Sequence, residues 1–219
     1  MSFNQIFKNE IINLTSYKII NCHAGKLPFY RGRNILNWAL INNEEEFGIT
    51  IHYVDKGVDT GDIILQETYP ITIQDNYATL IERAYIECAN ILYKAVCLFK
   101  NGGIVGKRQA EIDPTGFYCS QRKLGDEMLS WSHSSKDIFN FVRAICFPGP
   151  MARAFINGEE IKINKVELVN GAISYKCITG AILNINKEKV LVKTGDSVIK
   201  ITEYETEVKL KVGDRFEIK

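Results

Sequence analysis

Residues 20–32 read Ile-Asn-Cys-His-Ala-Gly-Lys-Leu-Pro-Phe-Tyr-Arg-Gly, a short apolar strand that runs into a loop interrupted by glycine and proline. We expect the strand to span residues 17–21. Because side chains alternate along a strand, Asn21 and His23 share one face and Cys22 points to the other. The carboxyl end of a parallel strand is where α/β proteins place ligands. The stretch therefore predicts a polar site at the end of this strand.

Strands and helices alternate on the carboxyl side of this stretch. Residues 34–41 predict a helix, residues 47–54 predict a strand, and residues 62–69 predict its antiparallel partner. A long helix is expected over residues 76–100, followed by the stop signal Asn101-Gly102-Gly103. Its apolar positions step by three or four and form one stripe: Tyr77, Leu80, Ala84, Cys88, Ile91, Ala95 and Phe99. This alternation indicates an α/β sheet.

The pattern changes after Asp113-Pro114-Thr115-Gly116, which we interpret as a linker between domains at 1–113 and 114–219. One more helix is predicted over residues 135–146. Short strands then follow, separated by turn signals of which Asn157-Gly158 is the first. Many short strands at such spacing predict a small β-barrel.

The composition is that of an ordinary globular protein of 219 residues, with 46% hydrophobic residues, 24% charged residues and a net charge of +1. No run of about 18 apolar residues predicts a membrane helix, and the first residues do not resemble a signal peptide. Six cysteines without a C-x-x-C pair favour reduced thiols in the cytoplasm over disulfides or zinc. The residues after Pro114 carry only a modest positive excess, so no nucleic-acid partner is expected.

A carboxylate joins Asn21 and His23 as a candidate for chemistry. Asp59 lies in a glycine-flanked turn between the two strands expected to pair. A histidine can take a proton from an attacking amine, an amide can donate to a tetrahedral oxyanion, and a carboxylate can orient the imidazole. The three residues together fit acyl transfer to an amine. Each alone has a simpler explanation, because a lone histidine after a strand is more often structural.

The ordered set of motifs resembles the folate-dependent formyltransferase family. Residues 20–64 contain its Asn-x-His pair, its Leu-Pro-x-x-x-Gly loop and its D-x-G-x-I segment in that order. The resemblance implies a Rossmann-like catalytic domain, catalytic roles for Asn21, His23 and Asp59, 10-formyltetrahydrofolate as donor, and no metal. Residues 122–152 resemble the carboxy-terminal domain shared by methionyl-tRNA formyltransferases and sugar N-formyltransferases, which implies an OB-like β-barrel.

The resemblance also implies residues that bind substrate or cofactor. They are Leu27, Pro28, Tyr30, Arg31, Gly32, Gly57, Thr60 and Gly61. Two of them have open alternatives: Tyr30 either stacks on a ligand ring or packs, and Arg31 either contacts substrate or is a solvated surface residue. His52, within the strand at 47–54, is interpreted as structural or surface-exposed.

The loop Arg31-Gly32-Arg33-Asn34-Ile35-Leu36-Asn37-Trp38 is similar to that of enzymes that formylate nucleotide-linked amino sugars. The expected acceptor is therefore dTDP-4-amino-4,6-dideoxyglucose, in the synthesis of surface polysaccharide such as lipopolysaccharide O-antigen, and the expected assembly is a homodimer. Two alternatives stay open: a methionyl-tRNA formyltransferase, and an inactive fragment or binding module of such an enzyme.

Only twenty residues precede Asn21, whereas members of the family begin with several more strand–helix units. Residues 1–7 resemble the end of an inner strand and the start of the following helix. We therefore expect a catalytic domain whose amino-terminal strands are missing.

Overall fold

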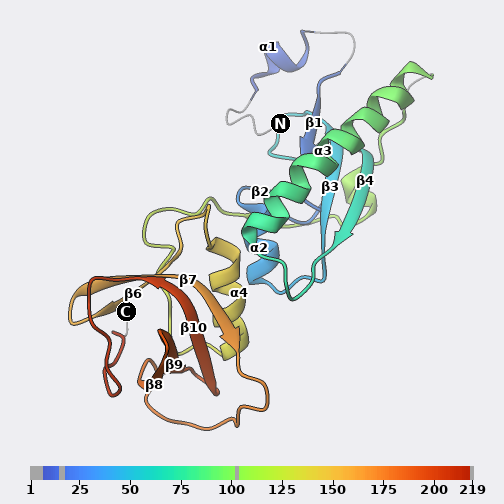
Figure 1. The fold of residues 1–219 in the computed structure, drawn as a ribbon. Coiled ribbons are helices and arrows are strands. Elements are labelled where there is room, and N and C mark those ends of the chain that lie inside the picture. The colour runs from blue at the N-terminus through green and yellow to red at the C-terminus, as the bar shows by residue number, and fades with distance from the viewer. Residues whose placement is uncertain (1–6, 15–17, 102–103, 218–219) are drawn as a thin grey trace. The chain divides into compact units, whose positions relative to one another are not determined.

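The computed structural model describes residues 7–14, 18–101 and 104–217 (Figure 1). The chain forms two compact units. The first comprises residues 1–39, 44–73 and 79–122, and the second comprises residues 40–43, 74–78 and 123–219. The expected start of the first strand at residue 17, the strand end expected within residues 1–6, and the glycines at 102 and 103 lie outside the described residues.

A three-stranded antiparallel sheet organises the first unit. Its order is β1 (Ile20–His23), β3 (Glu46–Tyr53) and β4 (Ile63–Pro70). The predicted antiparallel pairing of β3 with β4 is confirmed. The strand β1, which carries Asn21 and His23 and was expected to be parallel, runs antiparallel to β3, its partner among the described strands. The loop and short helix between β1 and β3 return the chain in the opposite direction.

The two helices of this region follow the predicted pattern closely. The helix α2 (Ile35–Ile41) comes between β1 and β3, and α3 (Tyr77–Lys100) follows β4. The stripe of α3 is buried along its centre at Leu80, Ala84, Cys88, Ile91 and Ala95, whereas its end residues Tyr77 and Phe99 are half-buried.

The helix α3 runs across the three-stranded sheet (Figure 1). Cys22 Sγ lies 3.8 Å from the carbonyl oxygen of Cys88, so this face of β1 packs on α3. Asn21 and His23, which alternate with Cys22, therefore face away from α3. In the described residues no helix, α3 included, combines the length and the apolarity that crossing a membrane requires.

Shorter elements complete the first unit. A parallel pair joins β2 (Arg31–Gly32) to β5 (Tyr118–Cys119), which ties the loop after β1 to a segment far along the chain. Two short helices, α1 (Asn9–Ile12) and the 3-10 helix η1 (Gln109–Glu111), lie at either end of this part of the sequence.

The second unit is a five-stranded antiparallel sheet with one helix, α4 (Ser135–Ile145). The strand order is β6-β7-β10-β9-β8. The bounds of the strands are β6 (Ala152–Ile156), β7 (Glu159–Leu168), β8 (Ile182–Asn186), β9 (Lys189–Lys193) and β10 (Val198–Glu205). Asn157 and Gly158 join β6 to β7 with positive φ angles of 51° and 82°, as the Asn-Gly hairpin signal requires. The β-rich fold read from the turn signals is thus confirmed.

Candidate active site

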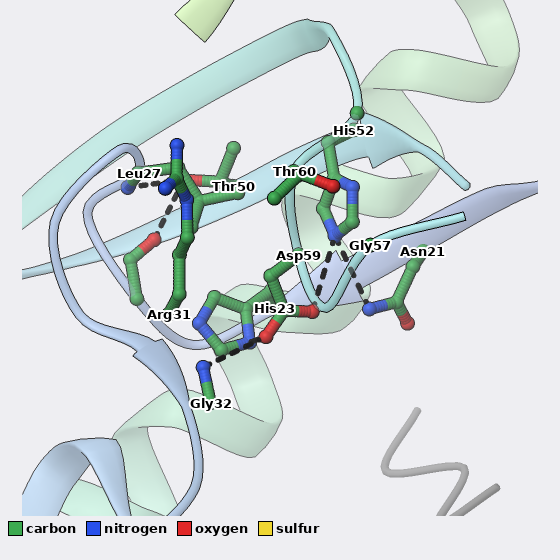
Figure 2. Close-up of polar contacts among 12 residues, drawn as sticks. Asn21, His23, Leu27, Arg31, Gly32, Thr50, His52, Gly57, Asp59 and Thr60 are labelled. Carbon is green, nitrogen blue, oxygen red and sulfur yellow. Dashed lines mark hydrogen bonds and ion pairs between the residues drawn. The ribbon is translucent and has the colours of Figure 1, made fainter. Parts of the chain in front are cut away.

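The structure brings Asn21, His23 and Asp59 to one cavity of about 500 Å³ in the first unit. Asn21 and His23 project from β1, and Asp59 comes from the loop between β3 and β4 (Figure 2). Tyr53, the last residue of β3, pairs with Ile20, so the loop leaves β3 beside the start of β1, and Asp59 lies back against His23. The three residues singled out from the sequence therefore lie together, although the pairing that unites them is not parallel.

The His23 ring is held in one tautomer. Its Nε2 lies 2.7 Å from the carbonyl oxygen of Tyr30, and because a carbonyl only accepts, Nε2 carries the hydrogen. Nδ1 of the neutral ring is then unprotonated and lies 3.6 Å from Asp59 Oδ2. A side chain at Gly25 would collide with both His23 Nε2 and Tyr30 O, so only glycine leaves room for this contact.

Asp59 has a fixed carboxylate and an unusual backbone conformation. Its Oδ2 accepts a 2.9 Å hydrogen bond from the N–H of Gly32, the residue that follows Arg31 in β2. Its backbone adopts the left-handed conformation, with φ at 54°. Non-glycine residues adopt this conformation uncommonly, although aspartate and asparagine do so more readily than most.

His52, interpreted from the sequence as structural or surface-exposed, is buried and belongs to the same cluster. Its side chain is 3% exposed, and its Nε2 lies 3.3 Å from Asn21 Nδ2 and 3.6 Å from Asp59 Oδ1. Its Nδ1 donates to the carbonyl of Tyr53 at 2.8 Å. The signal that finds it is the strand register, because Asn21 and His52 are direct cross-strand partners.

Burial and charge set the protonation of the two central groups. Burial lowers the pKa of His23, and the nearby Asp59 carboxylate and Tyr30 carbonyl oppose this shift without overcoming it. Burial alone raises the pKa of Asp59, but its contacts with His52, His23 and the Gly32 N–H outweigh burial and leave that pKa below its usual value. At neutral pH the pair is therefore a neutral imidazole facing a carboxylate.

The other residues expected to bind substrate divide into two groups. Gly32 and Gly57 line the cavity. Among the described residues, the cavity lining does not include the remaining six, which are Leu27, Pro28, Tyr30, Arg31, Thr60 and Gly61.

Several of these six are structural supports of the site. Tyr30 packs: it is 8% exposed, and its hydroxyl donates to Glu44 at 2.6 Å. Arg31 is not a solvated surface residue either, because it is 8% exposed and its guanidinium bonds to Gln109. Thr60 donates to the carboxylate of Asp55 at 2.6 Å within the loop that carries Asp59.

Two family models match this chain over separate ranges. Residues 1–96 match the formyl transferase family, and residues 123–214 match the formyl transferase C-terminal domain. Methionyl-tRNA formyltransferase of Thermodesulfovibrio yellowstonii is 34% identical over 202 residues, 92% of this chain and 62% of the relative. The enzyme of the same name from Halothermothrix orenii is 34% identical over 221 residues, 99% of this chain and 69% of the relative.

Among solved structures, an N-formyltransferase from Helicobacter canadensis, in complex with folinic acid and dTDP-3-aminofucose, is 27% identical with a TM-score of 0.68. The match covers 92% of this chain and 71% of that one. The chain spans 62% and 69% of the length of the two curated relatives above.

Proposed function

Because the chain belongs to the formyltransferase family, we propose that it transfers a formyl group from 10-formyltetrahydrofolate to a primary amine at the Asn21–His23–Asp59 cavity. One observation carries the proposal: an unprotonated imidazole nitrogen of His23 lies 3.6 Å from the half-buried carboxylate of Asp59, at the wall of a cavity. That is the arrangement of a general base whose protonated form is stabilised by a neighbouring charge.

In the proposed reaction the acceptor amine attacks the formyl carbon, and a new C–N bond forms as the carbonyl becomes a tetrahedral oxyanion. The amine gives up a proton to His23 Nδ1, because Nε2 is already occupied by the Tyr30 carbonyl. The oxyanion collapses, the bond to the folate nitrogen breaks, and that nitrogen takes the proton held by His23, which restores the neutral imidazole. Asp59 stabilises the transient imidazolium, with Oδ2 facing Nδ1.

The Asn21 amide is placed to donate a hydrogen bond to the oxyanion. His52 Nδ1 donates its hydrogen to Tyr53 O, so Nε2 is the ring nitrogen left to accept from Asn21 Nδ2. An amide nitrogen has two hydrogens, and the second remains available for the oxyanion. His52 thus orients Asn21 in the proposed mechanism, which makes it a positioning residue.

The folate donor is supported by two observations. The related Helicobacter canadensis structure contains folinic acid, a formyl folate. The cavity volume of about 500 Å³ lies within the usual range for small-molecule sites.

For the acceptor we propose a nucleotide-linked amino sugar such as dTDP-4-amino-4,6-dideoxyglucose. Arg33 and Asn34 line the cavity directly after Gly32, where they offer a cation and an amide to a sugar diphosphate. The bound dTDP-3-aminofucose of the Helicobacter canadensis structure supports the same class. Methionyl-tRNA is the second candidate, supported by the 34% identity to methionyl-tRNA formyltransferases.

The experiment offers both acceptors to the 219-residue chain with 10-formyltetrahydrofolate and follows the formylated product by mass. Formylated sugar that forms with the wild-type protein but not with His23→Ala supports the proposal. The matched control is His133→Ala, which removes an exposed histidine outside the first unit. Wild-type turnover in a folded His23→Ala protein rules out the assigned base, and product with methionyl-tRNA alone assigns the second candidate.

A chain that binds folate without forming either product is instead the binding module considered above. The homodimer expected from the family resemblance and the cytoplasmic location expected from the reduced cysteines remain part of the proposal. Light scattering of the purified protein tests the dimer directly.

A further inference from the structure

A buried amide lies against the loop that carries Asp59. Gln109, the first residue of η1, is 3% exposed and 50 residues away from Asp59 in the sequence. Its Nε2 donates to the carbonyl oxygens of Asp59 and Gly61, each at 2.8 Å. These two hydrogen bonds hold the loop at Asp59 itself and two residues beyond it.

Arg31 determines the orientation of this amide. Its Nε and Nη2 both donate to Gln109 Oε1, at 3.0 and 2.7 Å. A guanidinium has donors only, so the amide oxygen must face Arg31 and the amide nitrogen must face the two carbonyls. The reverse orientation would set N–H against N–H and oxygen against oxygen. Arg31, Gln109 and the Asp59 loop therefore form a chain of hydrogen bonds with a single allowed direction.

The same short strand also holds the Asp59 side chain. Gly32 follows Arg31 in β2 and donates its N–H to Asp59 Oδ2 at 2.9 Å. Asp59 is thus held at its backbone through Gln109 and at its carboxylate by Gly32 (Figure 2 shows the second contact). Two independent contacts explain how a non-glycine residue keeps a φ of 54°.

We infer that Gln109, oriented by Arg31, is a positioning residue that holds the Asp59 carboxylate against His23 Nδ1. Removing its N–H donors leaves two carbonyls of the loop unpaired, and the loop relaxes toward ordinary backbone angles. The carboxylate then moves away from the imidazole. The inference rests on the proposed function because it treats His23 as the base.

A purely structural role for Gln109 predicts a different result, and a matched control separates the two. Gln66 Nε2 also donates two hydrogen bonds of 2.8 Å in the first unit, to Leu27 O and Thr50 Oγ1. Gln66→Met and Gln109→Met each remove such a pair while keeping the side-chain length; Gln109→Met also removes the acceptor of Arg31, which Gln109→Glu retains. Only Gln109→Met changes contacts to the Asp59 loop.

The first readout is the titration of His23, followed by NMR of its ring nitrogens in wild type, both Met variants and Asp59→Asn. The titratable groups that face His23 are Asp59, from the loop, and His52, from β3. Displacing the Asp59 charge removes a contribution that raises the His23 pKa. We expect that pKa to fall in Gln109→Met toward its value in Asp59→Asn, and to stay at the wild-type value in Gln66→Met.

The second readout is kinetic. A displacement of about 1 Å at a reacting group costs about 10²-fold in rate, so kcat should fall by about 10²-fold in Gln109→Met while KM for the folate stays constant. Gln109→Glu keeps a partner for Arg31 but presents oxygen to both loop carbonyls, and we expect the same loss. An unchanged His23 titration in Gln109→Met, or wild-type kcat in Gln109→Glu, overturns the inference.

The two readouts also separate this inference from the proposed function. The His23 titration requires no turnover, so a wild-type protein without activity refutes the proposed reaction and leaves the positioning test intact. A wild-type protein with activity and an unshifted His23 titration in Gln109→Met refutes the positioning role alone.

Discussion

Replacing Asp59 with asparagine removes one charge and little else. Asparagine tolerates the left-handed backbone at least as well as aspartate. The Gly32 N–H requires an acceptor, so the amide oxygen of the new side chain takes the place of Oδ2 and its NH₂ group turns toward His52. The shape of the site, the loop and the Gly32 hydrogen bond are therefore retained.

The charge that is lost acts directly on the proposed base. His23 Nδ1 and Asp59 Oδ2 are 3.6 Å apart, and at an effective dielectric constant of about 20 the attraction between imidazolium and carboxylate is about 4–5 kcal/mol. Each factor of ten in rate corresponds to about 1.4 kcal/mol. Full loss of this attraction in the transition state therefore lowers turnover by about 10³-fold.

The assay is single-turnover formyl transfer with saturating folate and acceptor, measured for wild type and Asp59→Asn across a pH series. The acid limb of the rate profile should also move to lower pH, because the Asp59 charge raises the His23 pKa. Thermal unfolding of both proteins is the control for folding. A variant that retains about a tenth or more of wild-type turnover refutes the reasoning, since the charge would then contribute less than one factor of ten.

Two further predictions concern pH and the support of His23. Because the folded-state pKa values of His23 and Asp59 both lie below their unfolded values, the unfolded chain binds more protons, and the free energy of unfolding should fall as pH drops below about 6.5. Urea midpoints that do not decrease from pH 8 to pH 5 contradict this. Gly25→Ala should lower turnover by at least about 10²-fold, because the alanine side chain would occupy the space of the His23–Tyr30 hydrogen bond. The measurements are the formyl-transfer rate and the NMR signals of the His23 ring.

Much of the local structure follows from the sequence. The stripe of α3 is a pattern with a helical period, and its central residues from Leu80 to Ala95 are buried as predicted. The Asn157-Gly158 turn occurs because asparagine and glycine adopt the positive φ angles that a tight hairpin needs. The strand pair β3–β4 was likewise expected from two apolar runs joined by a glycine-flanked turn.

The partners of the candidate site depend on contacts between distant residues. His52 meets Asn21 only because β3 pairs with β1, across 31 residues. Gln109 meets Arg31 across 78 residues, and no period or turn signal marks it. Arg31, predicted either to contact substrate or to lie in solvent, is buried and bonded to Gln109.

The sequence by itself determined the family resemblance, the helices α2, α3 and α4, most of the strands and the candidate trio of Asn21, His23 and Asp59, because local periodicity, turn chemistry and motif order are properties of neighbouring residues. Only the tertiary structure decided the antiparallel partner of β1, the tautomer of His23 and the support of Asp59 by Gln109. Each of these depends on the direction of a single hydrogen bond or the register of one strand pair. Those are set when distant segments pack together, and no short stretch of sequence specifies them.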